Sequence, residues 1–197
     1  KVIVYPHGRD GAYIMPDSVV TISPYTFYNC DKLTSITSSN NLKDIGERAF
    51  YDCSGIKSIA FPDSLETIGS YAFYNCDHLS DISIPDGITK INEYVFYDCD
   101  KLYNVKFNPN ITTIKECAFY SCNILKDFEL PEKLQIIEAS AFAYCISVQR
   151  IVIPNDVSTI QSYAFSGCRA KNIIIGDSVE TIGVGAFEGQ LITSLYV

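Results

Sequence analysis

Cysteine is the most reactive residue type in this sequence, and seven of the eight cysteines recur at one position of a repeating pattern. A thiolate binds metal ions or attacks substrates when nearby groups lower the pKa of the thiol. Members of this row are 23 residues apart, unlike the closely spaced cysteine pairs of zinc sites. Each interior cysteine has two equivalent neighbours and the row has an odd number of members, which also argues against regular disulfide pairing. We favour a buried row of free thiols that pack as small apolar side chains, with disulfides or a metal site as the alternatives. The row is Cys30, Cys53, Cys76, Cys99, Cys122, Cys145 and Cys168.

Histidine and glycine add no clear catalytic arrangement. The two histidines are His7 and His78, and His78 follows Cys76 by two residues. Catalytic pairs are neighbours in space rather than in sequence, so this spacing is weak support for a nucleophile and its base. Cys117 lies outside the row and is interpreted as an incidental substitution, with an exposed, modifiable thiol as the alternative. Gly183 in "IGVGAF" aligns with other repeat glycines and indicates a turn rather than a phosphate site. We predict no enzyme activity, no catalytic residue, no cofactor and no metal.

Carboxylates also recur with the period of the repeat. Each follows the position where a strand is expected to end, and a turn explains an acidic residue there. A cation held along this acidic row is the alternative. The row is Asp17, Asp63, Asp86, Glu132 and Asp177.

The overall charge limits the kinds of partner. The chain of 197 residues has a formal net charge of −8, which argues against binding to nucleic acid or to an anionic membrane. No uncharged segment reaches the roughly 18 apolar residues of a membrane span. The apolar content of 47% is ample for the core of a single domain.

A 23-residue repeat positions all of these side chains. Phenylalanine recurs at this period, and the last member follows after 22 residues. Isoleucine precedes every one of these phenylalanines by five residues, and an aliphatic triple in the pattern L-x-x-I-x-I follows them. A single unit of this size cannot bury its own apolar face, so the units must stack. The column is Phe27, Phe50, Phe73, Phe96, Phe119, Phe142, Phe165 and Phe187.

The repeat predicts an α/β solenoid with a parallel sheet. The triple alternates as a short strand does, with aliphatic side chains inward and variable ones outward. Proline and an acidic turn then end the strand, and one or two turns of α- or 3₁₀-helix are expected over residues 70–76. We predict a right-handed, curved leucine-rich repeat solenoid, with the sheet on the concave face and short strands and helical turns on the convex side.

The pattern I-P-x-x-L-x-x-I-G-x-x-A-F-x-x-C-x-x-L-x-x-I resembles the leucine-rich repeat of the BspA-like surface proteins. The resemblance covers about nine-tenths of the chain. Local departures occur where Ser39, Asn108 and Gly176 replace the proline and where Gln190 replaces the last cysteine. The resemblance implies a cell-surface or secreted protein that adheres to host proteins or to other cells.

The two ends depart from the repeat. Residues 1–15 contain an Asp-Gly turn signal between two apolar segments, which predicts an antiparallel hairpin that caps the first coil. Residues 16–197 form the predicted single domain of eight stacked repeats. The last strand segment has no polar cap, so we expect the natural protein to continue beyond Val197.

Two variable surfaces are candidate binding sites. The outward positions of the central strands carry charged and polar side chains, although neighbours of opposite charge can also satisfy one another. A second candidate is a tyrosine stripe, whose pairs three residues apart would lie on one side of a helical turn. The strand residues are Asp81, Ser83, Asn104, Lys106, Asp127, Glu129 and Arg150, and those of the stripe are Tyr71, Tyr74, Tyr94 and Tyr97.

The function predicted from these features is non-enzymatic binding. The partner is expected to be a host matrix or cell-surface protein, with a glycan as a further possibility and without nucleic acid or membrane insertion. The alternatives are a spacer or targeting module of a larger surface enzyme, and a structural repeat array without a specific ligand.

Overall fold

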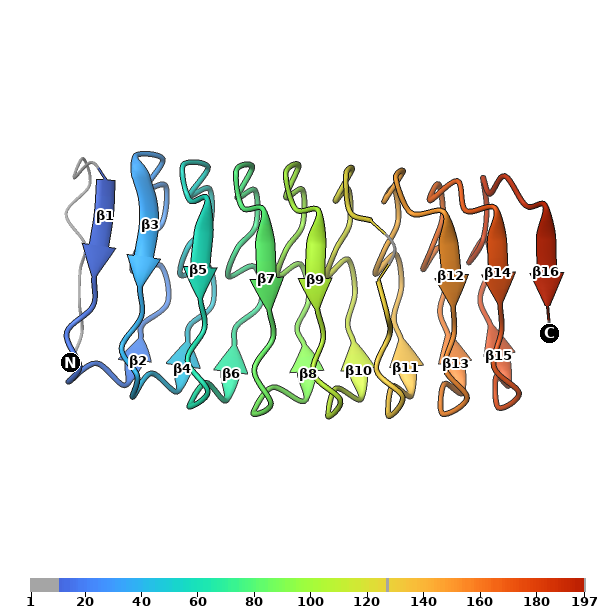
Figure 1. The fold of residues 1–197 in the computed structure, drawn as a ribbon, viewed down its shortest axis with the longest axis horizontal. Helices are drawn as coiled ribbons and strands as arrows, with labels where there is room; N and C mark the ends of the chain where they lie inside the picture. The colour runs from blue at the N-terminus through green and yellow to red at the C-terminus, as the bar shows by residue number, and fades with distance from the viewer. Residues whose placement is uncertain (1–10, 127, 197) are drawn as a thin grey trace.

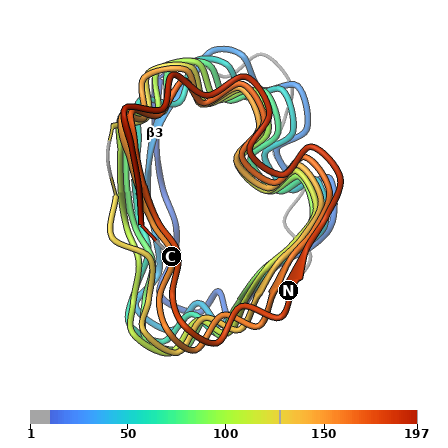
Figure 2. The ribbon, with the colours of Figure 1, turned by 90° about the vertical axis from the view of Figure 1, so that its right-hand side faces the viewer.

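The chain winds into a stack of coils that lie side by side along one axis (Figure 1). The structure is a computed structural model, and it describes residues 11–126 and 128–196. A view along the stack shows successive coils superposed on a common outline (Figure 2). The predicted parallel-sheet solenoid is therefore confirmed. None of the described residues forms a helix, and so none forms a helix that would cross a membrane.

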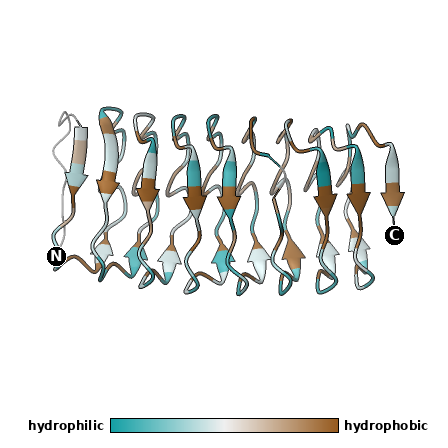
Figure 3. Ribbon diagram, in the orientation of Figure 1, coloured by the Kyte–Doolittle hydropathy of each residue, from teal (hydrophilic) through white to brown (hydrophobic). Residues whose placement is uncertain are grey.

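One side of each coil contributes to the strand wall. In β5, Ile59 is buried between exposed Ser58 and Ala60, as the apolar alternation predicts. Several strands begin with a hydrophilic residue and pass to a hydrophobic one (Figure 3). All pairs are parallel, in sheets of order β1-β3-β5-β7-β9 and β12-β14-β16. The strands are β1 (Gly11–Ile14), β3 (Leu33–Thr37), β5 (Ser58–Ala60), β7 (Asp81–Ser83), β9 (Asn104–Lys106), β12 (Arg150–Val152), β14 (Asn172–Ile174) and β16 (Ser194–Tyr196).

A second side carries two-residue strands, which we call the short wall. Each ends on the isoleucine that precedes the repeat phenylalanine by five residues. The sheets have the order β2-β4-β6 and β15-β13-β11-β10-β8. The strands are β2 (Thr21–Ile22), β4 (Asp44–Ile45), β6 (Thr67–Ile68), β8 (Lys90–Ile91), β10 (Thr113–Ile114), β11 (Ile136–Ile137), β13 (Thr159–Ile160) and β15 (Thr181–Ile182).

The third side of each coil carries the repeat phenylalanine and cysteine, and we call it the turn wall. Its structure shows that the prediction of helical turns is wrong. In the segment 69–76, Tyr71 and Asn75 adopt φ values of 60° and 57°, in the left-handed region that a right-handed helix excludes. Their amides bond to the next coil, from Tyr71 to the Glu93 carbonyl at 3.0 Å and from Asn75 to the Tyr97 carbonyl at 2.8 Å. The segment therefore exchanges hydrogen bonds between coils, where a helix would keep them local.

The core is a column of stacked rings beside the row of thiols. The phenylalanines from Phe27 to Phe187 stack on one another with ring centroids 4.8–5.6 Å apart. All but Phe187 are at most 1% exposed. Residues that are distant in sequence thus complete one another's burial, as the stacking hypothesis requires.

Two positions at which another residue replaces the repeat proline are held by different local contacts. The Asn108 amide group donates to the carbonyls of Pro85 and Ile88, and its side-chain oxygen accepts from the Asn110 amide. These bonds satisfy a buried polar side chain at the turn. At Gly176 a Cβ would lie 2.6 Å from the Pro154 carbonyl oxygen, so the close approach of the two coils requires glycine.

The N-terminal region adds a strand to the first coil. β1 pairs in parallel with β3 and covers its edge. The other segment of the predicted hairpin lies outside the described residues, so the hairpin and the boundary at residue 15 stay predictions. At the other end, Ile182 and Leu195 are half exposed, at 50% and 54%.

Candidate binding face

The strand wall is interrupted at the coil that contains Phe128. This residue occupies the inward position that Val105 holds in β9 and Ile151 holds in β12. Residues 128–130 form no strand, so one sheet ends at β9 and another begins at β12. Figure 1 shows the trace of this coil separated from both neighbouring strands.

The size of Phe128 explains the interruption. Its ring stacks on Phe142 with centroids 4.7 Å apart and meets Phe107 edge to face at 6.0 Å. A phenyl ring in a site shaped for a smaller aliphatic side chain forces the backbone outward. Phe128 itself stays only partly buried. The bulge therefore opens the strand wall on both sides of this coil.

Three adjoining hollows run along the lower rim of the strand wall, and we call them together the rim groove. Their volumes are about 530, 660 and 360 Å³. The first two share Phe107, Asn108 and Pro109, and the last two share Val152 and Pro154, so the groove is continuous across the coils. It crosses the stack, whereas the strands run along each coil.

The lining of the rim groove is apolar at its floor and mostly acidic at its edge. Aromatic and proline side chains dominate the middle hollow, with Leu130 and Val152 beside them. Arg150 and Lys106 are the basic members. The carboxylates are Asp63, Asp86, Glu129, Glu132 and Asp177.

The structure brings most of the predicted strand residues to this face. Ser83 and Lys106 line one hollow of the rim groove, and Glu129 and Arg150 line the next. Asp81 lies on the same wall, and it pairs in register with Asn104 across β7 and β9. Asp127 lies outside the described residues. Whether these residues bind a partner stays a prediction.

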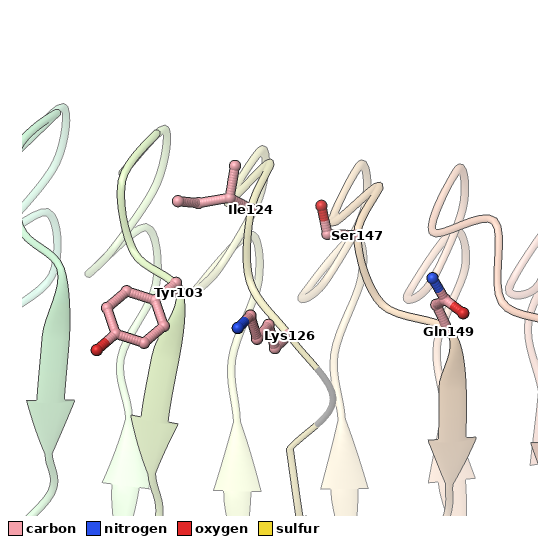
Figure 4. A pocket seen from close by; sticks show the side chains of 5 residues that line it. All are labelled: Tyr103, Ile124, Lys126, Ser147 and Gln149. Carbon is pink, nitrogen blue, oxygen red and sulfur yellow. The ribbon is translucent and has the colours of Figure 1, made fainter.

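A separate hollow of about 860 Å³ lies at the upper end of the strand wall (Figure 4). We call it the Lys126 hollow, and Tyr103, Ile124, Lys126, Ser147 and Gln149 line it. Sequence reasoning missed these residues. Three of them occupy the position just after the first aliphatic residue of the triple, and variation at that position was the available signal.

The predicted tyrosine stripe forms two stacked rows on the turn wall. Tyr74 stacks on Tyr97 and Tyr71 stacks on Tyr94, each with centroids 4.7 Å apart and nearly parallel planes. Burial raises the pKa of Tyr74 to about 12. Because each ring covers the face of the next, the middle tyrosines present mainly edges and hydroxyls. The stripe as a binding site stays a prediction.

Arg48 takes the place of a ring in the second row. It stands where the neighbouring coils have Tyr25 and Tyr71, and its guanidinium lies 4.4 Å from the Tyr71 ring centroid. The guanidinium also donates to the Tyr25 hydroxyl at 2.9 Å. A planar cation thus continues the aromatic stack.

The row of cysteines consists of free, buried thiols, as favoured from the sequence. Each thiol from Cys53 to Cys168 donates to the carbonyl of the phenylalanine 26 residues earlier, at 2.7–3.3 Å. Burial raises the pKa of the Cys76 and Cys122 thiols, which keeps them protonated and unreactive. Cys117 is also buried, at 8% exposure, which does not fit the alternative of an exposed thiol.

Gln190 replaces a cysteine without breaking the row. Its side-chain amide donates to the Phe165 carbonyl at 2.6 Å, which is the bond that a thiol makes in the other coils. Its oxygen also accepts from the Ala170 amide at 2.8 Å. The departure seen in the sequence therefore preserves the function of the position.

The residues considered for catalysis or metal binding do not converge. The Cys76 thiol bonds to the Phe50 carbonyl, whereas His78 Nδ1 lies 2.7 Å from the Ser54 carbonyl. Cys117 and Cys122 are five residues apart, a spacing found in some zinc sites. Across residues 11–126 and 128–196, no group of three or more histidine, cysteine or acidic side chains is arranged to hold a metal ion.

Comparison with known proteins gives the family and the fold. A model of the BspA type leucine rich repeat region matches residues 12–124 and 66–193. A search of curated proteins finds no match. A leucine rich cell surface protein of Faecalibacterium prausnitzii is 27% identical, with a TM-score of 0.71 over 95% of this chain and 60% of that one.

Further solved structures share the architecture. A leucine-rich repeat protein of Eubacterium ventriosum is 26% identical over 96% of this chain and 46% of that one, with a TM-score of 0.71. A leucine-rich repeat protein of T. pallidum, at 24% identity, has the same fold with a TM-score of 0.62 and covers 96% of this chain and 85% of that one. The stacked coils, the repeat and the matching family model agree, and the chain belongs to the BspA type leucine-rich repeat family.

Proposed function

We propose that this chain binds another protein through the rim groove, as part of a cell-surface or secreted adhesion protein. The observation that carries the proposal is the continuous groove with an apolar floor and an acidic edge at the interrupted coil. Repeat proteins bind through the positions at which their coils differ. The relative from Faecalibacterium prausnitzii is described as a cell surface protein, which supports the proposed location.

The groove favours one class of protein partner. Phe107, Phe128 and Leu130 offer apolar contact, while carboxylates outnumber basic groups along the edge. The chain as a whole is acidic as well, at −8. An extended or looped segment with apolar anchors and flanking lysine or arginine therefore matches both the shape and the charge.

Charge reversal at the edge tests the proposal. Purified host matrix and cell-surface proteins are screened for binding, and dissociation constants are measured for any that bind at two salt concentrations. The double variant Asp86→Lys with Glu132→Lys should weaken binding by about tenfold or more at low salt. The matched control, Asp31→Lys with Glu180→Lys, changes the charge equally at exposed residues outside the hollows and should bind as the unmodified chain does. Equal effects of the two double variants would contradict a role for the groove.

A further inference from the structure

The Lys126 hollow is distinct from the rim groove, because none of its five lining residues lines any of the three groove hollows. Tyr103, Lys126 and Gln149 come from three successive coils at equivalent positions, so the hollow crosses the coils. Its volume of about 860 Å³ lies within the range of small-molecule sites, roughly 300–1,000 Å³.

The electrostatic centre of the hollow is the Lys126 ammonium. Its Nζ lies 5.7 Å from the centroid of the Tyr103 ring. No carboxylate among the described residues lies within 4.0 Å of this Nζ. A hydrogen bond to Asp81 raises the pKa of Tyr103, so the hydroxyl is already engaged, and it points away from Lys126 in Figure 4. An ammonium held against a ring in an acidic protein offers a local site for an anionic group.

The remaining lining fits a ligand with hydroxyl groups and apolar C–H faces. Ile124 and Tyr103 are 40% and 39% exposed and give the hollow an apolar side. Opposite them stand the Ser147 hydroxyl and the Gln149 amide (Figure 4). The Ser147 hydroxyl donates to the Asn123 carbonyl at 2.8 Å, which leaves its oxygen lone pairs as acceptors.

We propose that the Lys126 hollow binds a carboxylated pyranose, such as a uronic or sialic acid unit of a glycan. The ammonium pairs with the carboxylate, the Ser147 hydroxyl oxygen accepts from a sugar hydroxyl, and the ring and the isoleucine contact the C–H face. An acidic peptide fits less well, because the hollow is lined by side chains across the coils, and none of its five lining residues belongs to a strand that could pair with a peptide backbone. This proposal is independent of protein binding in the rim groove.

Titration of the chain with simple sugars tests the proposal. Methyl β-glucuronide and a methyl sialoside are the charged probes, methyl β-glucoside is the neutral analogue, and a short acidic peptide represents the competing ligand. Chemical shifts of the Tyr103, Lys126 and Gln149 amides and calorimetry report binding. At least one charged sugar should saturate these shifts, and the glucoside should bind about tenfold more weakly or worse, since it lacks the charge-assisted bond.

Variants separate a built site from general charge attraction. Lys126→Gln should weaken binding of the charged sugar by about tenfold, whereas Lys171→Gln, at the equivalent exposed position of another coil, should leave it unchanged. Both positions are exposed, so circular dichroism should show intact folding. Failure of both charged sugars to saturate, equal binding of the glucoside, tighter binding of the acidic peptide, or an equal loss in Lys171→Gln would each overturn the proposal.

Discussion

The turn wall and the strand wall belong to the same repeat, yet they use it in opposite ways. On the turn wall, rings stack on rings and thiols bond to carbonyls in coil after coil, so the side chains complete one another. On the strand wall, Phe128 stands in an aliphatic position, the sheet divides, and hollows open on both sides. Regularity thus provides stability, and its interruption leaves hollows in the surface of the strand wall.

The largest effect on stability is expected when a ring is removed from the stacked column. Phe96→Ala should reduce the free energy of unfolding by about 3–5 kcal/mol, because it leaves a cavity between two stacked rings. Urea denaturation measures the change. Phe187→Ala is the control, since Phe187 stacks on Phe165 at the end of the column and is only partly buried. An equal loss at the two positions would contradict the cooperative column.

A smaller effect is expected from the half-buried tyrosine row. Tyr97 stacks between Tyr74 and Tyr120, so Tyr97→Ala should cost about 1–3 kcal/mol from two lost ring contacts and some burial. Tyr163→Ala is the comparison, because Tyr163 is 44% exposed. Urea denaturation should show a much smaller loss in the free energy of unfolding for Tyr163→Ala than for Tyr97→Ala. If the two costs were alike, stacking along the turn wall would contribute little.

Gln190 offers a more modest test of the thiol row. Gln190→Ala should destabilise the chain by about 1 kcal/mol, because the Phe165 carbonyl loses its side-chain donor and keeps only the longer bond from the Cys168 amide at 3.3 Å. Gln190→Cys should restore most of that loss, since a thiol donates to the equivalent carbonyl in the other coils. Thermal unfolding of both variants measures this. A cysteine variant no more stable than the alanine variant would show that the position does not depend on the bond.

The smallest effect concerns the pH dependence of an acidic corner beside the thiols. Partial burial and the charge of Asp100 raise the pKa values of Asp77 and Asp98. Their folded-state pKa values exceed the ordinary 3.8, so their contribution to stability is present at low pH and is lost as pH rises through the folded values. Asp100→Asn should therefore flatten this decline and raise stability slightly at neutral pH.

Glu93 provides an internal contrast when the free energy of unfolding is measured as a function of pH. Partial burial opposes its ionisation, but hydrogen bonds from Lys115 and Ser70 hold the pKa of Glu93 at about 2. Its contribution is present above the ordinary value of 4.5 and is lost as pH falls toward 2. Asp100→Asn should leave this acid limb of the stability curve unchanged. A shift of the acid limb instead of the upper one would contradict the assignment.

The sequence predicts the regular parts of the fold well, because the spacing of Phe73, Phe96 and Cys99 reports directly on stacking. It fails at the turn wall, where Tyr71 adopts a left-handed conformation that tyrosine does not signal, although Asn75 belongs to a residue type that is enriched in that conformation. At Phe128 the sequence shows an apolar residue in an inward position, but it does not show that the backbone is displaced there. The displacement arises because the phenyl ring is packed against the rings of two neighbouring coils. The Lys126 hollow lies at the same coil, and sequence variation marks three of its residues without showing that they border one hollow.

Amide hydrogen exchange across the strand wall tests the central claim most directly. The Ile84 and Ile153 amides bond to the Lys106 and Ile174 carbonyls at 2.9 Å, whereas within the described residues the Leu130 amide makes no such bond to the next coil. Leu130 should therefore exchange much faster than Ile84 and Ile153, and Phe128→Ile should slow it toward their rates. Equal protection at all three amides, or no slowing in Phe128→Ile, would contradict the claim that this ring opens the wall.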